Sequence, residues 1–318
     1  MAQTSIKTEL HSNNKHRNPY DFDALILANP LLSDHVIVNK YGTQTINFFD
    51  NEAVKQLNKS LLHKYYNIQF WDLPQPYLVP PIPGRVDYIH HVAQMMEDNN
   101  ADINNKRMPS GENISCLDIG VGANCIYPIV GSSEYGWSFV GTDIDKKALD
   151  VAQKIVDLNP DLKHKVELRL QENPKNIFDG IIGSEEKFDI TICNPPFFSS
   201  AKEAAEANMR KNRNLKNMAN KPELNFAGKS NELWCDGGED EFLANMIQQS
   251  RRYGNKCYWF TTLVSNESHL QNAYRALRKT KVAEVITLPM SQGNKTSRVL
   301  AWTFLNQYQQ KTWIAARW

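Results

Sequence analysis

Two consecutive prolines directly after an apolar run constrain the fold of this chain more than any other feature. The run, residues 188–193, has the pattern of a short buried strand. Pro195 and Pro196 must end that strand, because each proline fixes its own φ and lacks a backbone donor. Asn194 precedes a proline and is held near extended geometry. The strand ends in a stiff corner with free carbonyl groups, although the same residues are compatible with a simple proline-rich turn.

This corner carries the groups needed to hold the NH2 of a flat ring. The Asn194 side-chain carbonyl and the Pro195 backbone carbonyl can each accept one hydrogen bond from such an amine. Phe197 or Phe198 can stack on the ring, a contact of about 1–3 kcal/mol per base. The residues predicted to be catalytic are Asn194, Pro195, Pro196 and Phe197.

A second apolar run lies upstream and leads into a glycine-rich turn. Residues 114–119 have the pattern of a buried parallel strand, and Gly120 and Gly122 follow it. Glycines in this position let a ligand approach the backbone, although an ordinary tight turn would also use them. A dinucleotide-binding turn needs a third glycine where Cys125 stands, and no Walker sequence is present. NAD and ATP are therefore disfavoured as ligands.

An acidic residue ends the next expected strand. Residues 137–142 form an apolar run, and Asp143 stands at its tip, where the ribose hydroxyls of a nucleotide are held in α/β sheets. Asp145 opens a stretch with helical periodicity, and helix capping accounts for it. Ligands bind at the carboxyl ends of strands in such sheets, so the glycine turn, Asp143 and Asn194 are expected to share one edge. S-adenosylmethionine suits that edge better than NAD or ATP.

The remaining pattern predicts an open α/β sheet. Two late strands, residues 282–288 and 299–305, have no helix between them and are expected to form an antiparallel pair at the sheet edge. Further strands are expected at residues 166–170 and 256–262, and helices at residues 85–96, 240–252 and 266–279.

The first 80 residues are expected to form a separate leading region. Residues 22–32 resemble a short helix, two short strands are expected between residues 36 and 48, and Asp50 can cap another helix. Residues 74–83 contain five prolines and are interpreted as a rigid extended linker.

Composition limits the class of protein. The 318 residues carry a formal net charge of +1, and 41% are hydrophobic, which is enough for a sizeable core. No apolar run reaches about 18 residues and no signal-peptide core is evident, so a cytoplasmic protein without a membrane span is expected. The histidines show no metal-ligand spacing, and no metal is expected. The cysteines form no Cys-x-x-Cys pair and are expected to be free thiols: Cys116, Cys125, Cys193, Cys235 and Cys257.

Positive charge is concentrated in two segments. Residues 209–221 contain five basic residues and no acid, which suits a phosphate-binding arm, although a solvated loop would have the same composition. A smaller basic patch lies at the N-terminus. The predicted RNA-binding residues are Lys15, Arg17, Arg210, Lys211, Arg213 and Lys216.

The chain resembles the bacterial large-subunit ribosomal RNA adenine-N6 methyltransferases and the related eukaryotic methyltransferase-like enzymes that act on adenine in structured RNA. Asn-Pro-Pro-Phe alone is shared by DNA, RNA and protein methyltransferases, and the combination with the segment around Arg85 and residues 125–128 is much more specific. The matching stretches lie at residues 17–20, 83–90, 117–128, 143, 193–198 and 236–239.

The resemblance implies a class I S-adenosylmethionine-dependent methyltransferase: an α/β, Rossmann-like sheet with an antiparallel last strand pair, plus an N-terminal α+β extension. It implies an RNA-binding extension over residues 1–80 and a methyltransferase domain over residues 81–318, with a basic insertion around residues 199–236. Arg85 would reach the methionine carboxylate with its two-donor fork. The implied cofactor-binding residues are Arg85, Asp118, Gly120, Gly122, Asn124, Asp143, Pro174 and Asn194.

The expected reaction is methylation of the exocyclic N6 of an adenine in 23S ribosomal RNA, either free or in a large-subunit assembly intermediate. The same corner could hold a glutamine amide, so a protein glutamine N5-methyltransferase is one alternative. A catalytically silent RNA-binding module is another, although intact Gly120, Asp143 and Asn194 argue against it.

Overall fold

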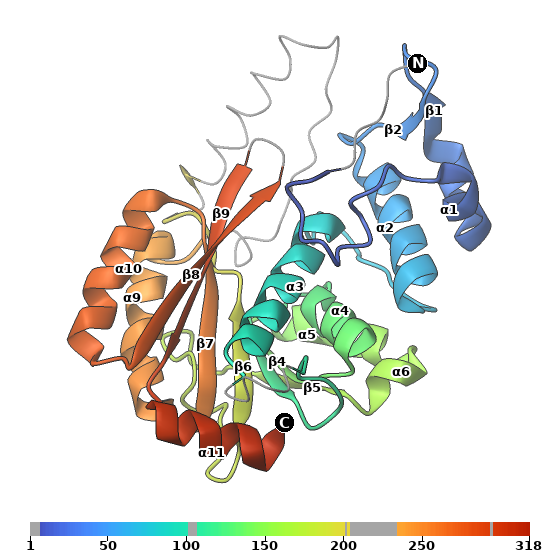
Figure 1. The fold of residues 1–318 in the computed structure, drawn as a ribbon. Helices are drawn as coiled ribbons and strands as arrows, with labels where there is room; N and C mark the ends of the chain where they lie inside the picture. The colour runs from blue at the N-terminus through green and yellow to red at the C-terminus, as the bar shows by residue number, and fades with distance from the viewer. Residues whose placement is uncertain (1–6, 101–106, 201, 204–233, 293–294) are drawn as a thin grey trace.

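A mixed sheet of seven strands forms the centre of the part of the chain that the structure describes (Figure 1). The structure is a computed structural model, and it describes residues 7–100, 107–200, 202–203, 234–292 and 295–318. The strand order is β5-β4-β3-β6-β7-β9-β8. The strands are β3 (Ser115–Ile119), β4 (Ser138–Asp143), β5 (Val166–Leu170), β6 (Phe188–Cys193), β7 (Cys257–Val264), β8 (Glu284–Gln292) and β9 (Lys295–Thr303).

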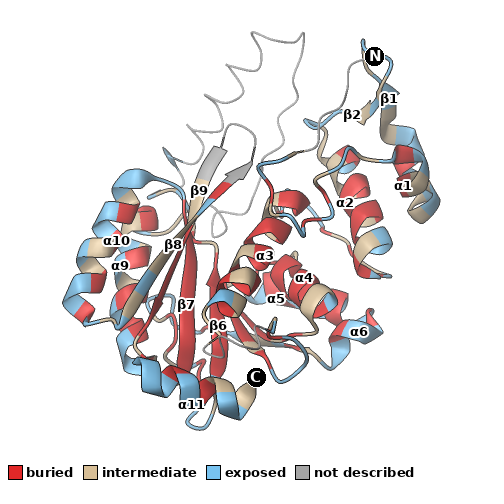
Figure 2. Ribbon diagram, viewed as in Figure 1, coloured by how far each residue is buried: buried red, intermediate tan, exposed pale blue. Residues whose placement is uncertain are grey.

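Helices cover both faces of this sheet. Side chains alternate along β3, so Cys116 packs on the face of the α3–α5 group while Leu117 packs on the face of α9 and α10. Figure 2 shows the central strands buried between these two helical layers. The helices are α3 (Ile82–Asp98), α4 (Ile126–Tyr135), α5 (Lys146–Asp157), α6 (Pro160–Lys163), α9 (Gly238–Ser250), η2 (Arg251–Tyr253), α10 (Glu267–Thr280) and α11 (Gln307–Arg317).

The sheet confirms the expected class I methyltransferase fold. β3, β4, β5, β6 and β7 pair in parallel, while β9 is antiparallel to both β7 and β8. The expected antiparallel pair of late strands therefore closes one edge of the sheet. The strand expected at residues 282–288 extends further, to Gln292.

The leading region contains α1 (Phe22–Ala28), η1 (Pro30–His35), β1 (Val36–Val38), β2 (Gln44–Ile46) and α2 (Asn51–Tyr66). Asp50 caps α2 as expected, accepting from the Glu52 N–H at 2.9 Å. The helix expected over residues 22–32 ends at Ala28, because Asn29 precedes Pro30 and takes extended geometry (φ −147°). The helix expected from residue 85 begins at Ile82, since a proline is tolerated in a first helical turn.

Buried polar contacts fasten the start of the chain to α3. Asp87 is 1% exposed and accepts hydrogen bonds from the His11 N–H at 2.7 Å and from Asn14 Nδ2 at 3.0 Å. His16 lies nearby, and burial lowers its pKa to about 3, so the ring is neutral where it bonds to the Tyr66 hydroxyl at 2.8 Å.

Among the described helices, none is long and apolar enough to cross a membrane.

Candidate active site

The strand register brings the expected site residues to one edge of the sheet. Ile119 pairs with both Thr142 of β4 and Cys193 of β6, so the residues after these strands leave the sheet at the same level. Gly120 and Asn194 therefore lie on adjacent strand ends, with Asp143 at the end of the neighbouring strand β4.

The glycine turn after β3 is held by backbone hydrogen bonds to β4. The N–H groups of Gly120 and Val121 both donate to the Thr142 carbonyl, at 2.9 and 2.8 Å. Gly120 has φ +76°, a conformation that favours glycine, and a Cβ built on it would meet nothing within 4 Å. The backbone at Gly120 is thus fixed, with open space where a side chain would stand.

Asp143 joins the glycine turn to the end of β4. Its Oδ2 accepts from the Gly122 N–H at 3.0 Å, and its Oδ1 accepts from the Asp145 N–H at 2.8 Å. Burial raises the pKa of this carboxyl, while the backbone donors act in the opposite direction. Asp145 itself accepts from the Lys147 N–H at 2.9 Å, which confirms its interpretation as the cap of α5.

Asp118 is a buried carboxyl without a hydrogen-bond partner among the described residues. It is 0% exposed, and neither of its carboxyl oxygens accepts a hydrogen bond there. Burial is the largest cause that raises the pKa of Asp118 well above its usual range, and the negative charge of Asp143 adds to it. Arg85 opposes this shift. An unpaired buried carboxyl is costly, so this position is not explained by stability.

Arg85 reaches the site from α3. Its Nη1 donates to the Tyr127 hydroxyl at 3.0 Å, and its guanidinium carbon lies 5.8 Å from the centre of the Tyr127 ring. Burial raises the pKa of Tyr127 to about 12, so the phenol is neutral. Tyr127 in turn makes an edge contact with Tyr88, at 5.4 Å between ring centres.

The corner after β6 is partly open to solvent. Pro195 is buried, Asn194 and Pro196 are half-buried, and the Phe197 side chain is 39% exposed. The Asn194 Oδ1 atom is buried and has no hydrogen-bond partner in the described part of the chain. The acceptor expected from the sequence is therefore present, and no described residue donates to it.

Tyr88 contacts the end of β6 directly before this corner, a role that the sequence did not indicate. Its hydroxyl accepts from the Cys193 N–H at 3.4 Å and bonds to Thr261 Oγ1 at 2.7 Å. Thr261 Oγ1 also lies 2.6 Å from the Thr191 carbonyl. One buried hydroxyl thus connects α3, β6 and β7 just before the corner. The partner residues are more than 100 positions away from Tyr88, so no local pattern could reveal the contact.

The exit from the corner is fixed against α9. Phe198 forms a bridge with Trp234, and its carbonyl accepts from the Cys235 N–H at 3.1 Å. Gly238 has φ +65°, and a Cβ there would lie 3.2 Å from the Ser199 backbone nitrogen. Glu239 is 1% exposed and accepts from the Ser265 N–H at 2.7 Å. Residues 236–239 therefore have a structural role, because these contacts hold the chain in place where it leaves the corner.

Two further segments border the glycine turn and Asp143. The Gln171 N–H donates to the Asp143 carbonyl at 2.8 Å, so the loop after β5 starts beside Asp143, and Pro174 in that loop is exposed. On the other side, Trp71 Nε1 donates to the Asn124 carbonyl at 2.9 Å. Trp71 belongs to the leading region, and sequence reasoning missed this contact as well.

Of the basic residues expected to bind RNA, the structure describes two, Lys15 and Arg17. Lys15 Nζ lies 2.7 Å from the Glu134 carboxylate at the end of α4, and its side chain is 42% exposed. Arg17 is half-buried. Arg210, Lys211, Arg213 and Lys216 lie outside the described residues.

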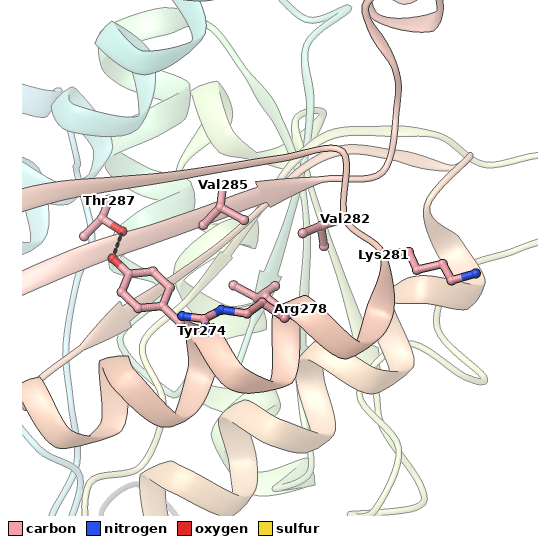
Figure 3. A pocket seen from close by; sticks show the side chains of 7 residues that line it. Tyr274, Arg278, Lys281, Val282, Val285 and Thr287 are labelled. Atoms are coloured by element: carbon pink, nitrogen blue, oxygen red, sulfur yellow. Dashed lines mark hydrogen bonds between the residues drawn. The ribbon is translucent and has the colours of Figure 1, made fainter.

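A separate hollow of about 530 Å³ lies between α10 and β8 (Figure 3). Tyr274 bonds to Thr287 across it at 2.7 Å, and Arg278 and Lys281 line it. β8 is three strands from β6 in the sheet, so this hollow is not part of the candidate site. In the described ranges, no group of three or more His, Cys, Asp or Glu side chains is placed to hold a metal ion.

Comparison with known sequences gives a consistent family. The profile of a family described as RNA methyltransferase matches residues 4–306. The protein named ribosomal RNA large subunit methyltransferase F of Cytophaga hutchinsonii is 50% identical over 98% of this chain and 96% of that protein. The protein of the same name from Bacteroides thetaiotaomicron is 52% identical over 94% of this chain and 99% of that protein.

Solved structures agree with the fold. The catalytic domain of human METTL16 in complex with the MAT2A 3′UTR hairpin 1 superposes with a TM-score of 0.78, at 29% identity, covering 94% of this chain and 96% of that chain. The N-terminal domain of human METTL16 in complex with SAH superposes with a TM-score of 0.72, at 26% identity, covering 93% of this chain and 99% of that chain.

Proposed function

This chain belongs to the RNA methyltransferase family, and we propose that it methylates the exocyclic N6 of one adenine in large-subunit ribosomal RNA. The enzyme uses S-adenosylmethionine as its methyl donor. One observation carries the proposal: Asn194 presents a carbonyl oxygen without a partner among the described residues, one strand away from the open turn at Gly120.

The residues at this edge fit the methyl donor. The Asp143 carboxylate has four acceptor positions, and the backbone N–H groups of Gly122, Ile144 and Asp145 occupy at most three of them, so lone-pair capacity is left for a ribose hydroxyl. The open turn at Gly120 admits a ligand close to the backbone. The Asp118 oxygens, which have no partner in the described ranges, lie one residue before the end of β3 and would be satisfied by donors of the ligand. The proposed cofactor-binding residues are Arg85, Asp118, Gly120, Gly122, Asn124, Asp143, Pro174 and Asn194.

The corner would act on the substrate amine by positioning it. S-adenosylmethionine supplies an electrophilic methyl group on a sulfonium. The amine of adenine is a weak nucleophile because its lone pair is conjugated with the ring. Asn194 Oδ1 and the Pro195 carbonyl would each accept a hydrogen bond from the amine. These bonds would favour a more pyramidal nitrogen whose lone pair is less conjugated and faces the sulfonium methyl, while Pro196 keeps the corner stiff. The exposed Phe197 ring can stack on the base.

The proton needs no strong base at this corner. After transfer the substituted nitrogen is cationic and acidic, so the neutral Asn194 amide does not have to remove a proton first.

The adenine must leave its stack to reach the corner, which costs a few kcal/mol and favours an unpaired base. We assign the grip on RNA phosphates to the predicted basic residues, and neutralising Arg210, Lys211 and Arg213 together is expected to flatten the salt dependence of RNA binding.

Transfer of a radiolabelled methyl group tests the proposal. Purified enzyme is given labelled S-adenosylmethionine together with large-subunit ribosomal RNA or large-subunit particles from cells that lack this enzyme, and the RNA is digested to nucleosides. We expect N6-methyladenosine at a single position. Label on another nucleoside would contradict the N6 assignment, and label on the glutamine of a release factor in a parallel reaction would favour the amide alternative.

A further inference from the structure

Exposed apolar side chains are concentrated at the outer end of the leading region. Of the thirteen large hydrophobic side chains that are exposed in the described part of the chain, seven lie between residues 27 and 49. Two of them, Leu27 and Val38, are 85% and 68% exposed. The seven are Leu27, Leu31, Ile37, Val38, Tyr41, Phe48 and Phe49, and we call them the apolar tip.

The elements that carry the apolar tip are connected to one another. β1 and β2 form a two-stranded sheet, with Ile37 opposite Thr45. Gln44 in β2 donates to the Asp23 carboxylate of α1 at 3.0 Å, and the end of η1 approaches the start of α2 through His35 and Asp50, 3.7 Å apart. In Figure 2, α2 has buried residues along much of its length, whereas β1 is intermediate or exposed and β2 is buried only at Ile46. Seven exposed apolar side chains on these connected elements favour an interaction surface.

The charges around the apolar tip select the kind of partner. Residues 18–50 contain four aspartates, Asp21, Asp23, Asp34 and Asp50, against a single lysine, Lys40. Three of the aspartates are exposed and the fourth is half-buried. Lys40 lies over the Tyr41 ring, 5.0 Å from its centre.

RNA does not suit this surface. Aromatic side chains bind single-stranded RNA when a positively charged groove holds the backbone beside them, and here the surrounding charge is negative. We propose that the apolar tip docks a basic protein segment that carries apolar side chains, as the protein component of a large-subunit particle would provide. This inference rests on the proposed function for the location of the partner. A separate protein contact would let the enzyme hold its substrate particle at a point other than the methylated base.

Site-specific cross-linking tests the occupant directly. A benzophenone amino acid placed at Val38 is irradiated with purified large-subunit particles from cells that lack this enzyme. The same amino acid at Tyr308 is the matched control, because that side chain is 79% exposed on α11, outside the apolar tip. We expect cross-links from position 38, and not from position 308, to a protein peptide rich in lysine and arginine. Cross-links to RNA, to a second copy of this chain or to nothing would overturn the inference.

Binding measurements provide a second test. The double variant Leu27→Gln/Val38→Thr keeps the helix and strand preferences of the two positions and removes apolar surface. We expect it to bind particles about tenfold or more weakly, and Asp34→Lys to weaken binding in a salt-dependent way. Tyr308→Gln should bind like the wild type. An unchanged affinity in both tip variants would contradict the inference.

Methyl transfer separates this inference from the proposed function. If the wild-type enzyme methylates no ribosomal RNA in any form, the proposed function fails. If it methylates the RNA while position 38 forms no protein cross-link, only the apolar tip has been misassigned.

Discussion

Two buried aspartates at opposite ends of the sheet differ in how the fold treats them. Asp189 is the second residue of β6, at the amino end of the strand, and is 0% exposed. It accepts from Trp313 Nε1 at 2.7 Å, from Arg317 Nη2 at 2.7 Å and from the Ser115 N–H at 2.8 Å. Asp118 lies toward the carboxyl end of β3, is equally buried, and accepts no hydrogen bond from the described residues. The hydrogen bonds to Asp189 offset the cost of burying its carboxylate. The burial of Asp118 without such bonds lowers the free energy of unfolding.

The comparison indicates that the two sheet ends have different tasks. At the amino end, α11 packs against the sheet, and its residues Trp313 and Arg317 donate hydrogen bonds to Asp189. The Asp189 carboxylate raises the pKa of the Arg317 guanidinium. At the carboxyl end, Asp118 and Asn194 keep acceptors that no described residue pairs with. Polar groups that the fold leaves unsatisfied in this way are expected where a ligand completes the site.

The largest effect is expected from Asp189→Asn. The substitution removes the buried charge that pairs with Arg317, so the free energy of unfolding should fall by about 3–5 kcal/mol. Chemical denaturation measures it, and cofactor affinity at low temperature should stay at the wild-type value. A decrease in the free energy of unfolding below about 1 kcal/mol would show that the contacts of Asp189 with α11 do not stabilise the fold.

The next effect is expected from Asn194→Ala. Removing the acceptor should lower kcat by about 10²–10³-fold, the size of effect that follows loss of one preorganised polar group. Cofactor affinity by calorimetry should largely persist, because Asn194 is one of eight residues proposed to hold the cofactor, and the free energy of unfolding should remain close to wild type. Asn266→Ala is the control, since Asn266 also follows a strand of this edge and its side chain makes no capping bond. Joint loss of binding and transfer would remove Asn194 from its assigned role.

A smaller effect is expected from Tyr88→Phe. The Cys193 N–H loses its acceptor, which should cost about 1–3 kcal/mol of stability and loosen the corner. kcat should fall while the KM for S-adenosylmethionine stays constant. Tyr258→Phe removes another buried hydroxyl, whose bond to Gln310 lies near α11, and it should leave kcat unchanged. Equal effects of the two variants on kcat would contradict a positioning role for Tyr88.

The smallest effect, and one of opposite sign, is expected from Asp118→Asn. Because the folded-state pKa of Asp118 is raised, the native state keeps this proton above the unfolded pKa of about 4 while the unfolded state releases it, so the free energy of unfolding falls as the pH rises. The free energy of unfolding of the variant should therefore be about 1 kcal/mol higher than that of the wild type at pH 7, and this difference should vanish below about pH 4. Its cofactor affinity should fall. A stability loss at pH 7 would place Asp118 with Asp189 as a structural group.

Much of the fold could be predicted because its signals are local. Apolar runs located β3, β4, β5 and β6, and the absence of a helix between the last two strands predicted their antiparallel pairing. α11 was missed, although Asn306 and Gln309 form a capping box that the sequence displays.

Gly120, Asp143 and Asn194 share a sheet edge because parallel strands end together. The contacts of Trp71 and Tyr88 could not be predicted, since each joins residues distant in the sequence through packing alone. The concentration of apolar side chains at residues 27–49 also became visible only through their exposure, because the sequence does not say which of them the fold covers.

A crystal structure with S-adenosylmethionine or its demethylated product tests the central claim most directly. The account predicts that the ribose hydroxyls contact Asp143, that the ligand runs over Gly120, and that the methyl position faces Asn194 with the corner open to solvent. A ligand bound elsewhere, for instance in the hollow between α10 and β8, would contradict the account. So would a corner covered by core side chains with no opening toward the methyl group.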